Sequence, residues 1–321
     1  MEAQAVNLSS LAKYFSDEGE AYKVIESWRW PDGPVCPHCS SVDHSYKLKN
    51  QKTKTGKVSP RRMWKCAECR KTFTVTVNSI FEDSHIPLLK WLLGAFLLAT
   101  GKNGVSSHEL SRSLNITIKA AWFMSHRLRH AMIDVNDSPF MKGIVEADET
   151  YIGGKVRGKG IGRGAYEQNK TPVVTLIQRG GKARSQVMAK VDGANLASAL
   201  RETVDPAAIL MTDTNPSYIK VGREFHDHMT VNHNVDEYVR GKGPTAAHVN
   251  TAEGYFSQLK RSIDGTHHHV SRQHLNRYLA EFDHRYNSRD VTDGERMVQT
   301  MRQAAGRRLT YRQPTRKPET V

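Results

Sequence analysis

The chain has 321 residues, which is enough for about two domains with substantial cores. It carries 47 lysine and arginine residues against 33 aspartate and glutamate residues, giving a net charge of +14 and a pI near 9.6. This excess favours a polyanionic partner, with nucleic acid ahead of an anionic membrane. Hydrophobic residues make up 38% of the chain, so the composition excludes wholesale disorder. We expect neither a membrane span nor a secretory signal, and therefore a cytoplasmic protein.

The chain is predicted to begin with a helical segment over residues 1–30, followed by a metal-binding segment over residues 31–78. All four cysteines lie in two Cys-x-x-Cys pairs, which are separated by 26 residues: Cys36, Cys39, Cys66 and Cys69. Four thiolates match the tetrahedral preference of Zn²⁺, and metal binding would supply folding energy to a segment with few large apolar residues. We therefore predict a structural zinc ribbon. A pair of redox motifs is the alternative, but the βαβ context of such sites is missing.

The loop between the two cysteine pairs is strongly basic. Eight lysine and arginine residues and no acidic residue occur between Lys47 and Lys65. We predict that this loop contacts DNA phosphates through four of them: Lys52, Lys54, Arg61 and Arg62. A solvated run of charges is the alternative interpretation.

Residues 79–137 are predicted to form three helices, over 88–99, 106–114 and 118–130. The short break around Asn115 gives the last two helices helix-turn-helix proportions. In the last helix, apolar residues repeat at helical spacing and are expected to face inward. Three basic residues fall on other faces and are predicted to contact DNA: Lys119, Arg127 and Arg129. A helical packing domain without DNA contacts remains the alternative.

Residues 138–290 alternate between strands and helices. Strands are predicted over 143–152, 172–178, 184–191, 208–213 and 229–233, with helices over 194–203, 249–263 and 271–286. This order predicts a mixed sheet with helices packed against it. A glycine-rich loop over 153–164 is predicted to contact DNA through Lys155 and Arg157, and it lacks the pattern of a nucleotide-binding loop. Residues 291–321 are predicted to form a basic C-terminal tail, which is expected to be flexible from Met301 onward.

Three acidic residues stand out by their positions in this pattern. Asp148 lies inside the first strand, Asp213 ends a short apolar strand, and Glu253 lies early on the helix over 249–263. Converging carboxylates repel one another unless a cation neutralises them, and hard oxygen ligands select Mg²⁺ or Mn²⁺. Such ions can promote phosphoryl transfer. Each acid alone is explained as a strand-end, turn or cap residue, whereas their combination favours a metal site.

The helix that carries Glu253 also carries basic residues toward its end. Lys260 lies two turns beyond Glu253 on the same side, so Lys260 and Arg261 are predicted to contact DNA beside the site. His233, near the end of the last strand, is expected to orient a phosphate or a carboxylate.

Three segments resemble the catalytic blocks of ISXO-type insertion-sequence transposases, which are bacterial DDE enzymes with an N-terminal zinc ribbon: VEADETYIGGK, ILMTDTNPSY and NTAEGYFSQLKRSIDGTHHHVSRQHLNRYLAEFDHRYNSR. The resemblance implies a ribonuclease H-like catalytic domain, with Asp148, Asp213 and Glu253 as catalytic metal ligands. Lys260 fits the family's acid-then-base spacing, which implies that it is a further catalytic residue. Asn250 is an alternative third residue, but the distance to Lys260 favours Glu253.

We therefore expect an α/β protein with a zinc ribbon, a helix-turn-helix domain and a ribonuclease H-like domain. The resemblance implies a transposase that binds terminal inverted repeats and then cleaves and joins double-stranded DNA with Mg²⁺ or Mn²⁺. It also implies a homodimer or larger assembly, without membrane or nucleotide, associated with the bacterial nucleoid. A domesticated DNA-binding regulator and a nuclease without strand transfer are the alternatives, although a regulator has no need of three acids and Lys260.

Overall fold

The computed structural model describes Asn7, residues 17–50, Lys52, Gly56 and residues 58–134, 140–153 and 170–310, apart from the side chain of Asn234. Three of the predicted DNA contacts lie outside the described residues: Lys54, Lys155 and Arg157. The chain divides into two compact units. The first runs to Met132 and resumes at Val291, and the second spans Ile133–Asp290. No helix within the described ranges combines the length and apolar character needed to cross a membrane.

From Asp17 onward, where the structure describes the chain continuously, the first unit begins with helix α2 and a small antiparallel sheet of order β1-β2-β3. Its elements are α2 (Glu18–Arg29), β1 (Ser45–Lys47), β2 (Trp64–Cys66) and β3 (Thr72–Phe73). Asp17 begins α2 by accepting a hydrogen bond from the Glu20 N–H. Trp30 packs edge-on against Trp64 and Phe73, at ring-centroid distances of 6.3 and 5.7 Å. The helix and the ribbon therefore share one apolar core.

The described part of this unit also contains the helices α3 (Leu88–Thr100), α4 (Ser107–Leu114), α5 (Ile118–Ala131) and α11 (Asp293–Arg302). Ser106 and Thr117 begin α4 and α5 by accepting hydrogen bonds from backbone N–H groups of the first turn. Asn115 ends α4 in the left-handed conformation, with φ of 48°, which asparagine tolerates better than most residues. The turn between α4 and α5 is therefore only three residues long.

Helix α11 corrects the prediction that residues 291–321 are only a basic tail, because it extends from Asp293 to Arg302. Met297 and Met301 are buried in the same core as α3 and α5. The Arg296 guanidinium donates a hydrogen bond to the carbonyl oxygen of Ala99, at the end of α3, over 3.0 Å. The first unit is therefore discontinuous in sequence, and the second unit is an insertion within it.

The second unit is built on a five-stranded sheet of order β6-β5-β4-β7-β8. Its elements are β4 (Ile144–Ile152), β5 (Thr171–Gln178), β6 (Ala183–Val187), α7 (Gly193–Thr203), β7 (Ile209–Asp213), η2 (Pro216–Tyr218), α8 (Ile219–Gly222), β8 (Asp227–Val231), η3 (His233–Val235), α9 (Asn250–Ser262), η4 (Ile263–His267) and α10 (Arg272–Asn287). The first three strands are antiparallel, and β7 and β8 run parallel to β4. The predicted mixed, ribonuclease H-like sheet is thereby confirmed.

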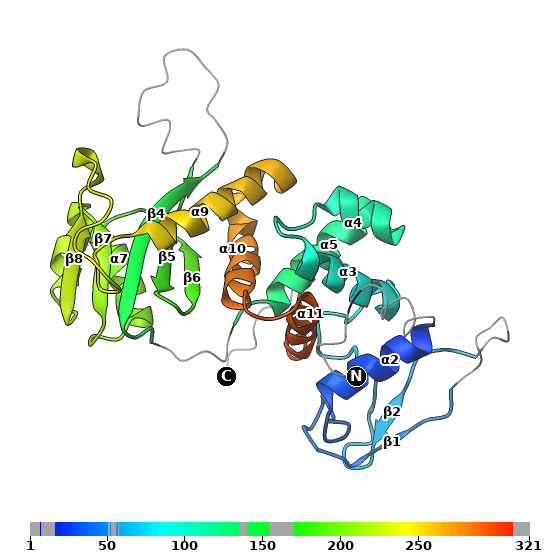
Figure 1. The fold of residues 1–321 in the computed structure, drawn as a ribbon. Helices are drawn as coiled ribbons and strands as arrows, with labels where there is room; N and C mark the ends of the chain where they lie inside the picture. Colours follow the sequence, from blue (N-terminus) through cyan, green and yellow to red (C-terminus); the bar gives the residue numbers. More distant parts are fainter. Residues whose placement is uncertain are drawn as a thin grey trace. The chain divides into compact units, whose positions relative to one another are not determined.

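Helices cover both faces of this sheet, with α7 on one face and α9 and α10 on the other (Figure 1). The assignment of faces follows the alternation of side chains along the strands. Val145 and Ala147 of β4 pack with α7, whereas Val173 and Ile177 of β5 pack with α9 and α10. The even-numbered residues of β4, which include Asp148, therefore face α9.

Helix α10 also supplies hydrogen-bond acceptors for the backbone N–H groups at the open edge of the sheet, on β6. Three of its polar side chains accept hydrogen bonds from alternate N–H groups: Asn276 from Val187 (3.0 Å), Asp283 from Ser185 (2.8 Å) and Asn287 from Ala183 (2.7 Å). Pairing with side chains blocks an edge that would otherwise recruit another strand. This arrangement fixes the α10 layer beside α9.

Candidate functional site

The pairing of β4 with β7 brings two of the predicted catalytic acids together. The two parallel strands pair Ile144 with Ile209 and continue to Glu146 with Met211, a constant offset of 65 residues. Asp148 and Asp213 have the same offset, so they are level on neighbouring strands and on the same face, with Asp148 in the middle of β4 and Asp213 at the end of β7. Neighbouring strands lie about 4.8 Å apart, which places these two carboxyl groups side by side.

The third acid, Glu253, comes from the first turn of α9, which covers this face of the sheet. Its side chain is exposed, and its Oε1 lies 3.5 Å from Nδ1 of His233, which lies two residues beyond the end of β8. The His233 ring packs edge-on against Tyr238, with a ring-centroid distance of 5.2 Å. Glu253 is therefore the carboxylate that His233 is predicted to orient.

The charges of these groups act on one another. Burial raises the pKa of Asp148 to about 6, even though its carboxylate accepts a hydrogen bond from the Glu149 N–H at 2.8 Å. The negative charges of Asp213 and Glu253 also contribute to this raised pKa, and the charge of His233 opposes them. A cluster of oxygen ligands with unneutralised negative charge fits a divalent cation.

The three acids are not as close together as the ligands of a closed metal site. Among the described residues, the only group of metal-binding side chains with all ligand atoms within 4.8 Å is the cysteine cluster. A cation shared by Asp148, Asp213 and Glu253 therefore requires their side chains to move closer. The side chain of Glu253 is long and exposed, so rotation about its bonds can supply part of this movement.

Glu149 is a fourth acid in this region, and the sequence pattern assigned it no role. Burial raises its pKa to about 7, and the charges of Asp213 and Asp148 raise it further. It points to the opposite face of β4 from Asp148, because neighbouring residues of a strand alternate. In the sequence, Glu149 is recognisable only as an acid that directly follows Asp148 in a predicted strand. That position alone does not distinguish a metal ligand from a residue that merely lies next to one.

Lys260 and Arg261 occupy the last turn of the same helix and are both exposed. Lys260 lies seven positions after Glu253, which is close to two full turns, so both side chains leave the helix on the same side. Their charge is thus available to an anionic ligand that approaches the carboxylates.

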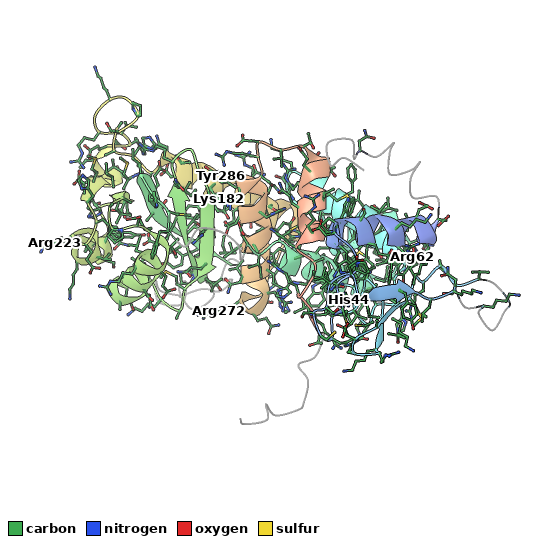
Figure 2. The ribbon with its side chains drawn as sticks, turned by 90° about the horizontal axis from the view of Figure 1, so that it is seen from below. His44, Arg62, Lys182, Arg223, Arg272 and Tyr286 are labelled. Carbon is green, nitrogen blue, oxygen red and sulfur yellow. The ribbon has the colours of Figure 1, made fainter. Side chains whose placement is uncertain are left out.

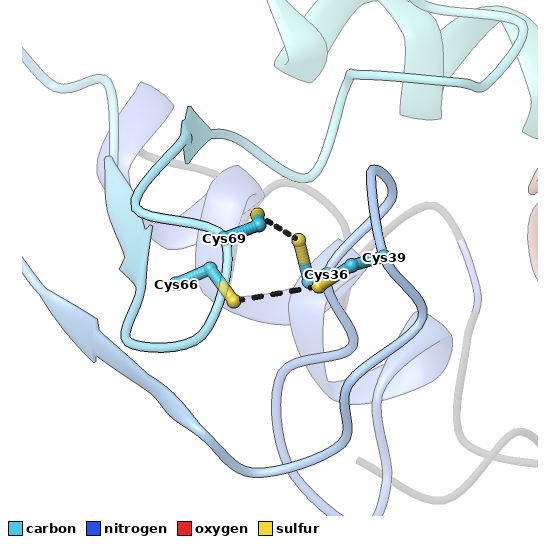
Figure 3. Close-up of side chains that lie close together, drawn as sticks. All are labelled: Cys36, Cys39, Cys66 and Cys69. Carbon is cyan, nitrogen blue, oxygen red and sulfur yellow. Dashed lines mark hydrogen bonds between the residues drawn. The ribbon is translucent and has the colours of Figure 1, made fainter.

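The four cysteines form the second site, and they meet as predicted. The Sγ atoms of Cys36 and Cys69 lie 3.6 Å apart, as do those of Cys39 and Cys66 (Figure 3). All four sulfur atoms lie within 4.8 Å of one another. Zn–S bonds of about 2.3 Å in a tetrahedron place sulfur atoms about 3.8 Å apart, so the cluster fits Zn²⁺.

The thiols of this cluster titrate very differently. Backbone N–H groups of Cys69 and Glu68 help lower the pKa of Cys66 to about 6. The Ser41 N–H favours the Cys39 thiolate, but desolvation and hydrogen bonds with three neighbouring thiols raise the pKa of Cys39 to about 12. Four adjacent thiols cannot all ionise without a cation, so Zn²⁺ binding must release protons.

Removing the metal is expected to unfold the ribbon. The Cys66→Ser variant, or treatment with a strong chelator, should release one Zn²⁺ and abolish the ordered structure of β1–β3, because structural Zn²⁺ contributes about 10–16 kcal/mol to such modules. Metal analysis combined with near-ultraviolet circular dichroism of Trp30 and Trp64 checks this. A near-native spectrum in a zinc-free protein would contradict the structural role.

The basic residues of the ribbon have different surroundings. Lys52 and Arg61 are exposed, as expected for phosphate contacts. Arg62 instead lies beside α2, where its Nε donates a hydrogen bond to Glu26 over 2.6 Å (Figure 2). The Trp64 indole N–H donates to the same carboxylate over 2.9 Å. Arg62 therefore fastens the ribbon to α2, which corrects its assignment as a simple DNA contact.

Two predicted contacts on α5 are also corrected. Arg127 and Arg129 are only 5% and 1% exposed, so neither can reach DNA from the surface. Arg127 donates hydrogen bonds to the carbonyl oxygens of Ile80, Glu82 and Leu309 and stacks on Phe123. Both residues hold the helical core together. Lys119, at the start of α5, is exposed.

Comparison with known families agrees with these two sites. The zinc-ribbon part matches the family model described as "Transposase zinc-ribbon domain" over residues 16–72. The second unit matches the model described as "ISXO2-like transposase domain" over residues 140–287. The chain carries an ISXO2-like transposase domain, which a transposase zinc ribbon precedes. It is thus a DDE-type transposase of an insertion sequence, with a zinc ribbon at its N-terminal side.

One relative of this transposase is named as a protein of a transposable element. The chain is 26% identical over 286 residues to "Uncharacterized protein in transposable element ISH50" of Halobacterium salinarum. The alignment covers 84% of this chain and 91% of the relative.

Solved structures resemble the transposase only weakly. An intasome of simian T-cell lymphotropic virus shows 12% identity and a TM-score of 0.27, covering 58% of this chain and 66% of the other. A pre-cleavage Mos1 transpososome has the same identity and TM-score, with coverage of 62% and 71%. Scores this low carry no argument, so the fold assignment rests on the sheet order itself.

Proposed function

We propose that this transposase binds the terminal inverted repeats of its insertion sequence and catalyses metal-dependent strand cleavage and strand transfer. The observation that carries the proposal is the shared offset of β4 and β7, which sets Asp148 beside Asp213 on the face covered by α9. Glu253 approaches the same place from α9, and its charge acts on Asp148. Two strands and a helix thus supply three carboxylates to one site.

These carboxylates are the proposed ligands of Mg²⁺ or Mn²⁺. When bound, such ions activate the attacking oxygen and stabilise the leaving oxygen of an in-line displacement. In the cleavage step, water attacks phosphorus and the bond to the 3′ oxygen breaks, which exposes a 3′-OH. In the transfer step, that 3′-OH attacks a target phosphodiester and displaces another 3′ oxygen. Both displacements have the same geometry, so one site serves both.

The proposed DNA contacts outside the catalytic site combine three regions of positive charge. Lys52 and Arg61 lie on the ribbon, Lys119 lies at the start of α5, and Lys260 and Arg261 lie on α9. The proposal extends to three residues outside the described part of the chain: Lys54, Lys155 and Arg157. Helix α5 follows α4 after a three-residue turn, as the recognition helix of a helix-turn-helix does. Joining two DNA ends also requires at least two copies of the protein.

A strand-transfer assay tests the proposal and separates it from the two alternatives. The full chain is incubated with Mg²⁺, a pre-cleaved element end and target DNA. We expect joined products whose formation depends on the divalent ion. Cleavage of uncut ends without joining would indicate a nuclease, and binding without either reaction would indicate a DNA-binding regulator.

Lys260→Ala is expected to weaken binding to end DNA and to lower the slope of log K against log salt concentration by about 1, because one phosphate contact is lost. Lys190→Ala is the matched control, since Lys190 is also exposed but precedes α7 on the other face of the sheet. Fluorescence-anisotropy titrations at several salt concentrations measure both. Equal slopes for the wild type and Lys260→Ala would exclude Lys260 from the DNA interface.

A further inference from the structure

Helix α9, which carries Glu253, does not cap its own N-terminus. The residue at the cap position is Val249, whose side chain accepts no hydrogen bond. Glu146 of β4 supplies the missing acceptors. Its carboxylate accepts hydrogen bonds from the N–H groups of Thr251 (2.9 Å) and Ala252 (3.2 Å) and from the Thr251 hydroxyl (2.9 Å). A capping carboxylate from a strand therefore fastens the helix to the sheet.

Glu146 is completely buried, so its charge must be compensated by protein groups. Arg179, which directly follows β5, donates from Nε to the Glu146 Oε1 over 3.0 Å. The same guanidinium donates to the carbonyl oxygens of Pro244 (2.8 Å) and Ala246 (3.0 Å). It also approaches Nδ1 of His248 at 3.2 Å. Arg179 thus fastens the segment that leads into α9, while it neutralises Glu146.

The position of this network relative to the catalytic acids is specific. Glu146 precedes Asp148 by two residues on the same face of β4, and its partner Thr251 precedes Glu253 by two residues on α9. One buried carboxylate therefore links the strand of Asp148 to the helix of Glu253. A small displacement of α9 at this contact would move Glu253 directly, because only half a helical turn lies between them.

We propose that Glu146 is a positioning residue, which sets the separation of Asp148 and Glu253 and thereby tunes the affinity of the site for its divalent ion. This inference rests on the proposed function. Groups that orient ligands from behind are typically worth about 10- to 100-fold in metal affinity. Glu146 itself is directed at the helix terminus and is not proposed as a ligand.

The Glu146→Gln variant of the full chain tests this role. Glutamine keeps the size of the side chain but removes the charge and turns one acceptor into a donor facing the helix N–H groups. We expect Mn²⁺ binding, followed by electron paramagnetic resonance, to weaken about 10- to 100-fold. Hydrogen exchange at the Thr251 and Ala252 amides should accelerate. Zinc content and binding to end DNA should stay at the wild-type level.

Glu281→Gln is the matched control, because Glu281 is also buried, at 1% exposure, and pairs with Arg285 on α10. It tests whether the loss of any buried carboxylate has the same effect, and we expect wild-type Mn²⁺ affinity. Equal weakening in both variants would overturn the specific role of Glu146.

A second variant decides the matter if Glu146→Gln does not fold. Thr251→Val removes only the hydroxyl donor to Glu146 and should weaken Mn²⁺ binding in the same direction by a smaller factor. A folded Glu146→Gln protein with wild-type Mn²⁺ affinity, or the same result for Thr251→Val when the first variant does not fold, would overturn the positioning role alone. If the Asp148→Asn variant binds Mn²⁺ as tightly as the wild type does, the proposed function would be overturned as well.

Discussion

Replacing Asp148 with asparagine is expected to lower strand transfer by at least about a thousandfold while the protein stays folded. Asparagine has nearly the same shape, but it is a neutral and weaker ligand for a hard cation. The variant also removes one of several charges that repel one another near β7 and α9. Strand-transfer rates, measured with Mg²⁺ and pre-cleaved ends, check the loss. Circular dichroism checks the fold.

The same substitution should change how stability depends on pH. The folded-state pKa of Asp148 is raised to about 6, so the metal-free protein favours the protonated side chain. Its contribution to stability is complete below the ordinary pKa near 4 and is lost as pH rises through 6. The wild type should therefore lose stability between pH 4 and pH 6 relative to Asp148→Asn, and Mg²⁺ should restore part of it at pH 7.

Asp227→Asn provides the control for both measurements. Asp227 is exposed and lies at the start of β8, at the opposite end of the sheet from Asp213. Its replacement should leave strand transfer and the pH profile unchanged. Full activity of Asp148→Asn would show that this carboxylate is not a catalytic ligand.

Truncation after residue 290 is expected to unfold the first unit, although the deleted part lies far along the chain from the ribbon. The truncation removes Met297, Val298 and Met301 from the core that contains α3 and α5. Each buried side chain of this size contributes about 1.5–3 kcal/mol. The total approaches the 5–15 kcal/mol that stabilises a typical domain. End-DNA binding should therefore disappear together with cooperative unfolding of this unit.

Truncation after residue 310 is the matched control, because it keeps α11 and every residue of the first unit that the structure describes. It should retain cooperative unfolding and DNA binding. Thermal unfolding followed by tryptophan fluorescence distinguishes the two truncations, since four of the five tryptophans belong to the core of this unit or pack against it. An unchanged transition after removal of residues 291–321 would contradict the discontinuous unit.

The zinc site was predictable because its determinants are local. Each cysteine pair closes a turn within four residues, and four thiolates suit Zn²⁺ whatever the rest of the fold. The mixed sheet was also predictable, since β5 and β7 are largely apolar runs of strand length. Which strands pair is a tertiary property, so the side-by-side placement of Asp148 and Asp213 required the structure.

The wrong assignments concern residues whose partners are distant in sequence. Arg127 has the exposure pattern of a surface residue by helical periodicity, but its carbonyl partners lie 45 to 182 residues away. Helix α11 carries an apolar stripe, which the basic composition of the surrounding tail obscured. In the sequence, Glu146 is recognisable only as an acid that precedes Asp148. Its role as a cap could not be predicted, because the helix it caps begins more than 100 residues later.

The catalytic site itself remains the prediction on which the proposed activity depends. The acids are brought to one end of the sheet and act on one another electrostatically, yet they must move closer to share an ion.

The most direct measurement is anomalous diffraction from crystals of the full chain bound to end DNA and soaked in Mn²⁺. We predict at least one anomalous peak within about 2.5 Å of carboxylate oxygens from Asp148, Asp213 and Glu253. A well-ordered site without such a peak at saturating Mn²⁺, or a peak held by other residues, would contradict the central claim that these three acids hold the catalytic ion.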